Sequence, residues 1–181
     1  MPDKTVLVVV DVQERLAAAM PQQQIRELLR AARILVEGAR ILGAPVLLTE
    51  QYPQGLGPTL GEISQLVDSA GGRRYEKLEF SACDAPGLRG VLDELSSSSA
   101  IVIGMESHVC VYQTVRDLVS RGLEVHVPID GVTSRRDDHR EAGIALCERA
   151  GAIRTTSESV VFDWLERAGS EEFKQLSKLI R

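Results

Sequence analysis

Short runs of apolar residues alternate along the chain with longer stretches in which apolar positions recur every three or four residues. The short runs predict buried strands, and the longer stretches predict amphipathic helices packed against them. We expect strands at residues 5–10, 45–49, 74–77, 100–104, 124–128 and 152–155, of which 74–77 has the weakest pattern. We expect helices at residues 22–42, 61–67, 86–95, 109–121, 136–150 and 170–180.

The regular alternation of strand and helix is typical of repeated βα units. It predicts an α/β protein with a three-layer, Rossmann-like fold: a six-stranded, mostly parallel sheet with helices on both faces. The 181 residues match one ordinary domain, so we expect a single domain over residues 1–181. In such sheets ligands bind at the carboxyl ends of the strands, so the residues that follow the strands are the ones to examine.

Composition and charge narrow the classes of partner. The chain is 44% apolar and carries a net charge of −5, with basic residues interspersed among acidic ones. Without a basic stripe it is not expected to bind nucleic acid. The first apolar run, Val6 to Val10, is too short for a membrane span or a signal-peptide core, so we expect no membrane association.

The three cysteines, Cys83, Cys110 and Cys147, are scattered and form no CxxC pair. This pattern fits neither a disulfide framework nor a zinc ribbon, and it favours a reducing, cytoplasmic location. No metal site is expected, because the chain has no HxH, HExxH or DxH spacing. No cofactor is expected either: the glycines of QYPQGLGPT at 51–59 do not form a phosphate-binding pattern.

Cys110 has the most distinctive setting. The segment IVIGMESHVCV at 101–111 predicts a buried strand that turns after Gly104 and delivers the thiol near the start of a helix. The apolar stripe of that helix contains Val111, Val115 and Leu118, and Cys110 lies off it. A free cysteine is commonly a small buried hydrophobe. Here the placement leaves both a buried role and a nucleophilic role open.

Asp11 and Lys77 follow two other strands at the same edge of the sheet. A nearby ammonium and a helix start would stabilise a thiolate at Cys110, and a carboxylate would transfer protons during the reaction. Two alternatives stay open. Asp11 with Glu14 resembles a helix-capping box, and Lys77 could be a solvated surface charge.

Histidine offers a rival arrangement. His108 is the imidazole nearest to Cys110 in sequence, but two residues on a helix are separated by about 200° of rotation, so their side chains would diverge. His126 within a strand and His139 in a charged segment read as structural or solvated. Cys147 reads as a core residue and Cys83 as incidental.

Three phrases together resemble the isochorismatase-like superfamily of cysteine hydrolases. They are VLVVVDVQ at 6–13, KLEFSAC at 77–83 and GMESHVCV at 104–111. The phrase ARILGAPVLLTEQYPQGLG at 39–57 is most similar to the isochorismatase domain-containing proteins. The resemblance spans most of the chain in the right order.

The resemblance implies roles for particular residues. It makes Asp11 the acid–base group, Lys77 its partner and Cys110 the nucleophile. It places a cis peptide between Met105 and Glu106 and an oxyanion hole at the backbone N–H groups of Glu106 and Cys110. It also implies a homo-oligomer. The missing DxH metal site argues against nicotinamide as the substrate.

We therefore expect a hydrolase that cleaves a small-molecule carbonyl substrate, an amide first of all, through a thioester on Cys110. Gln51 and Tyr52 are candidate substrate contacts. Three other hypotheses stay open: an isochorismatase-type vinyl-ether hydrolase, which the presence of the cysteine disfavours; a binding or scaffold module without turnover; and a thiol redox sensor.

Overall fold

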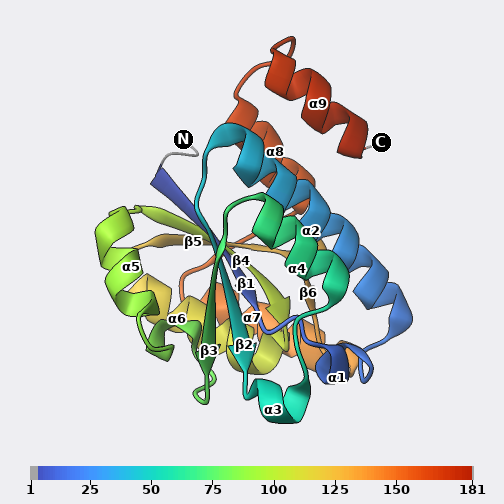
Figure 1. Cartoon of the computed structure of the whole chain (residues 1–181), viewed down its shortest axis with the longest axis vertical. Helices are drawn as coiled ribbons and strands as arrows, with labels where there is room; N and C mark the ends of the chain where they lie inside the picture. Colours follow the sequence, from blue (N-terminus) through green and yellow to red (C-terminus); the bar gives the residue numbers. More distant parts are fainter. Residues whose placement is uncertain (1–3, 181) are drawn as a thin grey trace.

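A computed structural model describes residues 4–180, which form a three-layer α/β fold around one parallel sheet (Figure 1). The strands are β1 (Thr5–Val10), β2 (Val46–Gln51), β3 (Arg73–Lys77), β4 (Ser99–Met105), β5 (Glu124–Pro128), β6 (Val132–Thr133) and β7 (Ile153–Thr155). Their order is β3-β2-β1-β4-β5-β7, with β6 paired to β4. Each pairing between these strands is parallel. The α/β prediction is confirmed.

Helices cover both faces of the sheet because the central strands are apolar on both sides. In β1, Leu7 and Val9 pack on one face and Val6, Val8 and Val10 on the other. The first face is covered by α2 (Gln22–Leu42), α4 (Gly61–Ser69), α8 (Ser157–Leu165) and α9 (Glu171–Ile180). The second is covered by α5 (Leu88–Leu95), α6 (Tyr112–Ser120) and α7 (Asp137–Arg149).

Helix α2 shows how closely the apolar pattern can fix an element. It spans the predicted 22–42 range, and its buried side chains include Leu28, Leu35 and Val36. Gly43 ends it in the left-handed region at φ 80°, where glycine carries no Cβ penalty. No helix among residues 4–180 is long and apolar enough to span a membrane.

Three sequence predictions need correction. The sheet has seven strands among the described residues rather than six, because the two-residue β6 is too short to leave an apolar pattern. Helix α8 was not predicted, since Ser157–Leu165 follows β7 directly. The helix predicted at 109–121 begins only at Tyr112, because residues Ser107–Val111 form a wider π-helical turn.

Gly104 brings the ends of β1 and β4 together. Its backbone has φ 130°, and a Cβ at this position would lie 2.0 Å from the carbonyl oxygen of Val10. Only glycine fits a conformation and a contact of this kind. The close approach sets the segment after β4, which carries Cys110, beside Asp11 at the end of β1.

Candidate active site

Asp11 follows β1 and is fully buried in a left-handed backbone conformation, φ 50°. Its Oδ1 accepts a hydrogen bond of 2.7 Å from Thr49 Oγ1, and its Oδ2 accepts one of 2.6 Å from Lys77 Nζ. The capping alternative is wrong, because α1 (Glu14–Ala17) has Gln13 at its N-cap and no side-chain cap. Both carboxylate oxygens are held from neighbouring strands instead.

Lys77, the last residue of β3, points into the same site, and its side chain is fully buried. Besides the Asp11 carboxylate, its ammonium donates to the carbonyl oxygens of Glu79 and Phe80, both at 3.1 Å. The surface-charge alternative is therefore wrong. An ammonium has three N–H donors, and three acceptors surround this one, so its hydrogen-bonding capacity is filled within the protein.

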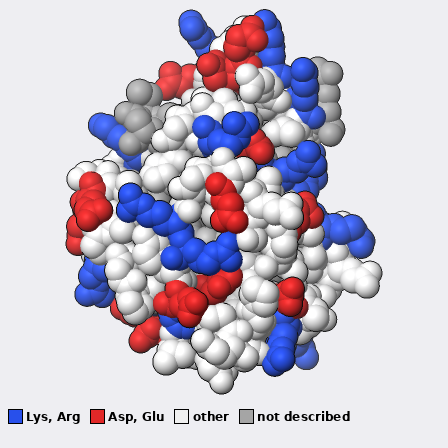
Figure 2. All heavy atoms as spheres, viewed as in Figure 1, with Lys and Arg blue, Asp and Glu red and all other residues white. Residues whose placement is uncertain are grey.

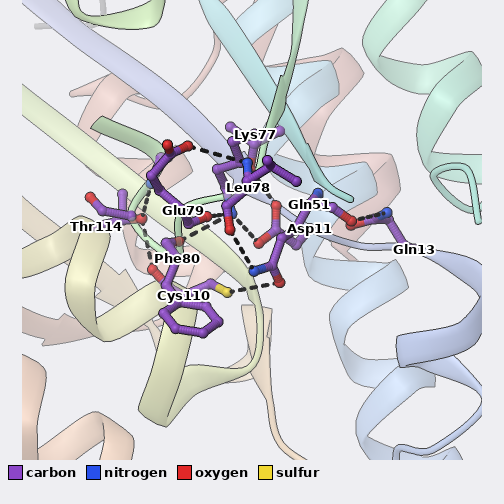
Figure 3. A network of polar contacts seen from close by, with 12 residues as sticks. Asp11, Gln13, Gln51, Lys77, Leu78, Glu79, Phe80, Cys110 and Thr114 are labelled. Atoms are coloured by element: carbon purple, nitrogen blue, oxygen red, sulfur yellow. Dashed lines mark hydrogen bonds and ion pairs between the residues drawn. The ribbon is translucent and has the colours of Figure 1, made fainter. Parts of the chain in front are cut away.

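Cys110 lies in the π-helical turn and is buried between β4 and α6. Its thiol donates a long hydrogen bond of 3.9 Å to Gln51 Oε1 (Figure 3). Burial raises the pKa of Cys110, and the negative charge of the Asp11 carboxylate raises it further. Lys77 opposes this shift, but the net pKa lies well above its ordinary value.

The expectation of a thiolate stabilised by Lys77 is thus wrong for this structure. Lys77 lies against Asp11, and the effect of its positive charge on the sulfur is smaller than the combined effects of burial and the Asp11 carboxylate. Cys110 also sits inside a π-helical turn rather than at the first residue of an α-helix. What the site offers is a neutral thiol next to a carboxylate that can accept its proton.

Glu106 joins the site through the Met105–Glu106 peptide bond, which is cis, as the resemblance implied. The Glu106 side chain is nearly buried and receives hydrogen bonds from the Arg135 backbone N–H and guanidinium, at 2.7–3.2 Å. Burial acts to raise the pKa of Glu106, but the bonds and charge of Arg135 outweigh it, so the net pKa lies below its ordinary value.

Of the two candidate substrate contacts, Gln51 contacts the thiol, whereas Tyr52 lies at the protein surface. Gln51 ends β2, and its Nε2 also donates to the Leu78 carbonyl oxygen at 3.3 Å. Tyr52 is about half exposed, and its backbone N–H donates to the carbonyl oxygen of Lys77 at 2.8 Å. Gln51 and Tyr52 therefore lie where β2 passes into the following loop, beside the end of β3.

Sequence reasoning missed the residue that holds this loop. Gln13 is fully buried; its Nε2 donates to the carbonyl oxygens of Gln51 and Gly57, and its Oε1 accepts from the Gln51 backbone N–H. A polar residue two positions after Asp11, just past a buried strand, was the available signal. Arg135 was missed as well, because nothing in the sequence pairs it with Glu106.

The cysteine–histidine alternative finds no support in the geometry. His108 Nδ1 lies 3.0 Å from Ser134 Oγ, and the imidazole ring packs against His139 at 4.7 Å between centroids. The imidazole is engaged by these two residues rather than by Cys110. Burial is the main reason that the pKa of His108 is lowered. The charge of Glu106 acts to raise this pKa, whereas the charges of His139 and Arg135 lower it further.

The other two cysteines, Cys83 and Cys147, are buried as well. Burial raises the pKa of Cys83 to about 11 and that of Cys147 to about 12. Cys147 lies on the buried face of α7, in the core, as predicted. Within residues 4–180 there is no cluster of three or more histidine, cysteine, aspartate or glutamate side chains that could hold a metal ion.

Comparison with known proteins identifies the family. The model of the isochorismatase domain matches residues 5–159. Isochorismatase domain-containing protein 2 from Rattus norvegicus is 34% identical over 181 residues, which cover 99% of this chain and 82% of that protein. The chain therefore belongs to the isochorismatase family, and it is a hydrolase.

Solved structures agree with this assignment. The structure of the MAR1 ribonuclease from Caenorhabditis elegans is similar with a TM-score of 0.91 and 37% identity, covering 99% of this chain and 90% of that one. Two more distant structures show the same fold. The N-carbamoylsarcosine amidase from Thermoplasma acidophilum has a TM-score of 0.71 and 24% identity, covering 86% of this chain and 97% of that one. The YcaC gene product from Escherichia coli, described as an octameric hydrolase of unknown specificity, has a TM-score of 0.84 and 18% identity, covering 98% and 88%.

Proposed function

We propose that this protein hydrolyses a carbon–nitrogen bond in a small carbonyl compound, through a thioester formed on Cys110. Asp11 is the proton-transfer group, and Lys77 holds the Asp11 carboxylate in place and compensates its charge. The observation that carries the proposal is a buried thiol in the same site as a fully buried carboxylate, which Thr49 of β2 and Lys77 of β3 hold by hydrogen bonds (Figure 3).

In the first half-reaction, Cys110 Sγ attacks the carbonyl carbon while its proton passes to the Asp11 carboxylate. The backbone N–H groups of Glu106 and Cys110 stabilise the oxyanion. Asp11 then protonates the leaving nitrogen, the carbon–nitrogen bond breaks, and ammonia or an amine departs. In the second half-reaction, Asp11 takes a proton from water, the hydroxide attacks the thioester, and the proton returns to sulfur as the acid is released.

Fold-level similarity to an amidase supports a carbon–nitrogen bond as the target. The test is a panel of small primary and N-substituted amides, with release of ammonia or amine as the readout and intact-mass detection of an acylated chain. Turnover with an acyl adduct on Cys110, absent in Cys110→Ala and retained in Cys147→Ala, is the expected result. Turnover that persists in Cys110→Ala would overturn the mechanism.

Hydrolysis of RNA is a second candidate, because the nematode structure with 37% identity is described as a ribonuclease. The net charge of −5 and the absence of a basic stripe argue against it. On the face drawn in Figure 2, basic and acidic side chains are interspersed. Cleavage of a labelled single-stranded RNA that is lost in Asp11→Asn would favour this candidate over amide hydrolysis.

We further propose that the protein assembles as a homo-oligomer, as the octameric YcaC hydrolase does, and that residues 1–181 fold as one domain. Light scattering of the purified chain tests the first point, with a mass several times that of one chain as the expected result. A monomer at micromolar concentration would contradict it. Denaturant unfolding of the purified chain tests the second point, with one cooperative transition as the expected result.

A further inference from the structure

A pocket of about 350 Å³ opens beside the candidate active site, between the loop after β2 and the loop after β3. Its walls combine apolar side chains with two carboxylates: Tyr52, Pro53, Leu78 and Pro86, with Glu76 and Glu79. Lys77 also borders it. The pocket therefore lies against the same lysine that holds Asp11.

The Gln51 side chain contacts both the thiol and the wall of this pocket. Gln51 accepts from Cys110 Sγ at 3.9 Å and donates to the Leu78 carbonyl oxygen at 3.3 Å, so it bridges the sulfur and the pocket wall (Figure 3). Both contacts are at the long end of the hydrogen-bond range, which makes them weak. A substrate amide can replace both contacts.

No cation around this pocket is available to a carboxylate group on a substrate. Lys77 is the one lysine or arginine among the described residues that border it, and its three donors already have acceptors in the protein. Arg135 does not border this pocket, and it is paired with Glu106 through its guanidinium and its backbone N–H. An incoming anion would instead meet the carboxylates of Glu76 and Glu79.

The two loops that frame the pocket expose large apolar side chains. Tyr52, Leu78 and Phe80 are 52%, 73% and 49% exposed, and they come from the two loops that frame the pocket. They are three of the six large apolar side chains that are markedly exposed among residues 4–180. Exposed apolar surface gathered beside a pocket is typical of a site that binds an apolar ligand group.

We propose that the site selects an uncharged carbonyl compound whose nitrogen carries an apolar substituent, and that this substituent occupies the pocket beside Leu78. Anionic substrates are excluded by uncompensated carboxylates and by the lack of a free cation. The inference rests on the proposed function, since it assigns the substrate class of the same thiol. In the amide panel, we therefore expect neutral, N-substituted amides to be better substrates than amides that carry a carboxylate.

The charge selectivity can be measured without a known substrate. Iodoacetamide and iodoacetate both form an S–CH₂ bond to Cys110 with loss of iodide, and they differ in charge. The ratio of the two labelling rates at Cys110 is measured by peptide mass spectrometry. It is then divided by the same ratio in the urea-unfolded chain, because this step removes the difference in intrinsic reactivity between the two reagents. We expect the native site to prefer iodoacetamide by at least tenfold. A normalised ratio near one, in a protein whose labelling still depends on Asp11, would overturn the substrate class and leave the proposed function standing.

The apolar preference is tested with N-phenylmaleimide and N-methylmaleimide, which add the thiol across the same double bond, with the thiol proton ending on carbon. We expect Cys110 to favour the phenyl reagent, and Leu78→Asn to reduce that preference, taken as the ratio of the two labelling rates, at least threefold. Leu146→Asn, a matched change at an exposed position of α7, should leave both rates unchanged. An equal phenyl preference in wild type and Leu78→Asn would contradict the placement of the substituent. If Asp11→Asn leaves labelling by every reagent unchanged, the proposed function itself fails.

Discussion

Lys77 Nζ lies 2.6 Å from Asp11 Oδ2, although 66 residues separate them in sequence and neither side chain is exposed. Removing one member of a buried ion pair leaves the other charge without compensation. Lys77→Met should therefore lower the free energy of unfolding by about 3–5 kcal/mol, measured by urea denaturation.

A double-mutant cycle isolates this pair. In the Lys77→Met/Asp11→Asn double variant neither charge remains, so the loss should be well below the sum of the two single losses. Arg89→Met provides the control, because Arg89 and Asp84 form an exposed pair that contributes about 1 kcal/mol or less. Additive losses for Lys77 and Asp11 would show that the two charges do not compensate each other.

Gln13 is expected to control the loop that carries Gln51 and Tyr52. Gln13→Ala removes three partly buried hydrogen bonds to this loop and should cost about 2–4 kcal/mol of unfolding free energy, at roughly 1 kcal/mol for each bond. Limited proteolysis should then cut within residues 52–58. Gln23→Ala, at an exposed position of α2, should change neither property; a cleavage pattern shared by both variants would contradict this role.

The approach of β1 and β4 gives a steric prediction. Gly104→Ala would force a Cβ to within 2.0 Å of the Val10 carbonyl oxygen at φ 130°, so it should destabilise the fold by at least about 3 kcal/mol. Gly90→Ala is the matched control, because Gly90 lies within α5 and a Cβ there meets no atom within 4 Å. That change should stabilise the protein by about 0.5–1 kcal/mol. Equal effects of the two changes, followed by thermal unfolding, would refute the close contact.

Arg135 should influence stability in a pH-dependent way. The pKa of Glu106 is lowered in the folded protein, so its ionised form contributes stability above the ordinary glutamate pKa of about 4.3, and this contribution is lost as the pH falls through the lower, folded value. Arg135→Gln weakens the shift. The decrease in unfolding free energy that Arg135→Gln causes, relative to wild type, should therefore be largest at pH 7 and smaller at pH 3.5.

The control for this prediction is Arg26→Gln, because Arg26 donates to the uncharged Gln23 side chain. Its effect on unfolding should be similar at both pH values. A difference between wild type and Arg135→Gln that stays constant between pH 7 and pH 3.5 would mean that Arg135 does not act through the ionisation of Glu106.

The sequence predicted the convergence of Asp11, Lys77 and the Cys110 segment because the carboxyl ends of parallel strands share one edge of a sheet. Apolar periodicity likewise predicted the central strands and α2. These properties depend on local pattern and on a general rule of topology. Both can be read without knowing which side chains touch.

The protonation state of Cys110 could not be predicted in the same way. It depends on how deeply the thiol is buried and on whether Lys77 faces the sulfur or the carboxylate, and both are tertiary properties. The role of Gln13 depends on carbonyl groups more than 35 residues away in the chain. The two-residue strand β6 pairs only through its backbone with β4, which leaves no mark on side-chain pattern.

The central claim is that Asp11 accepts the proton of Cys110, and the rate of Cys110 alkylation by iodoacetamide at pH 7 tests it most directly. Asp11 raises the pKa of Cys110, so Asp11→Asn lowers that pKa and populates more thiolate. If thiolate population alone set the rate, the variant would react faster. Because Asp11 is the proton acceptor, we predict that the variant reacts at least tenfold more slowly than wild type; an equal or faster rate in Asp11→Asn would contradict the account.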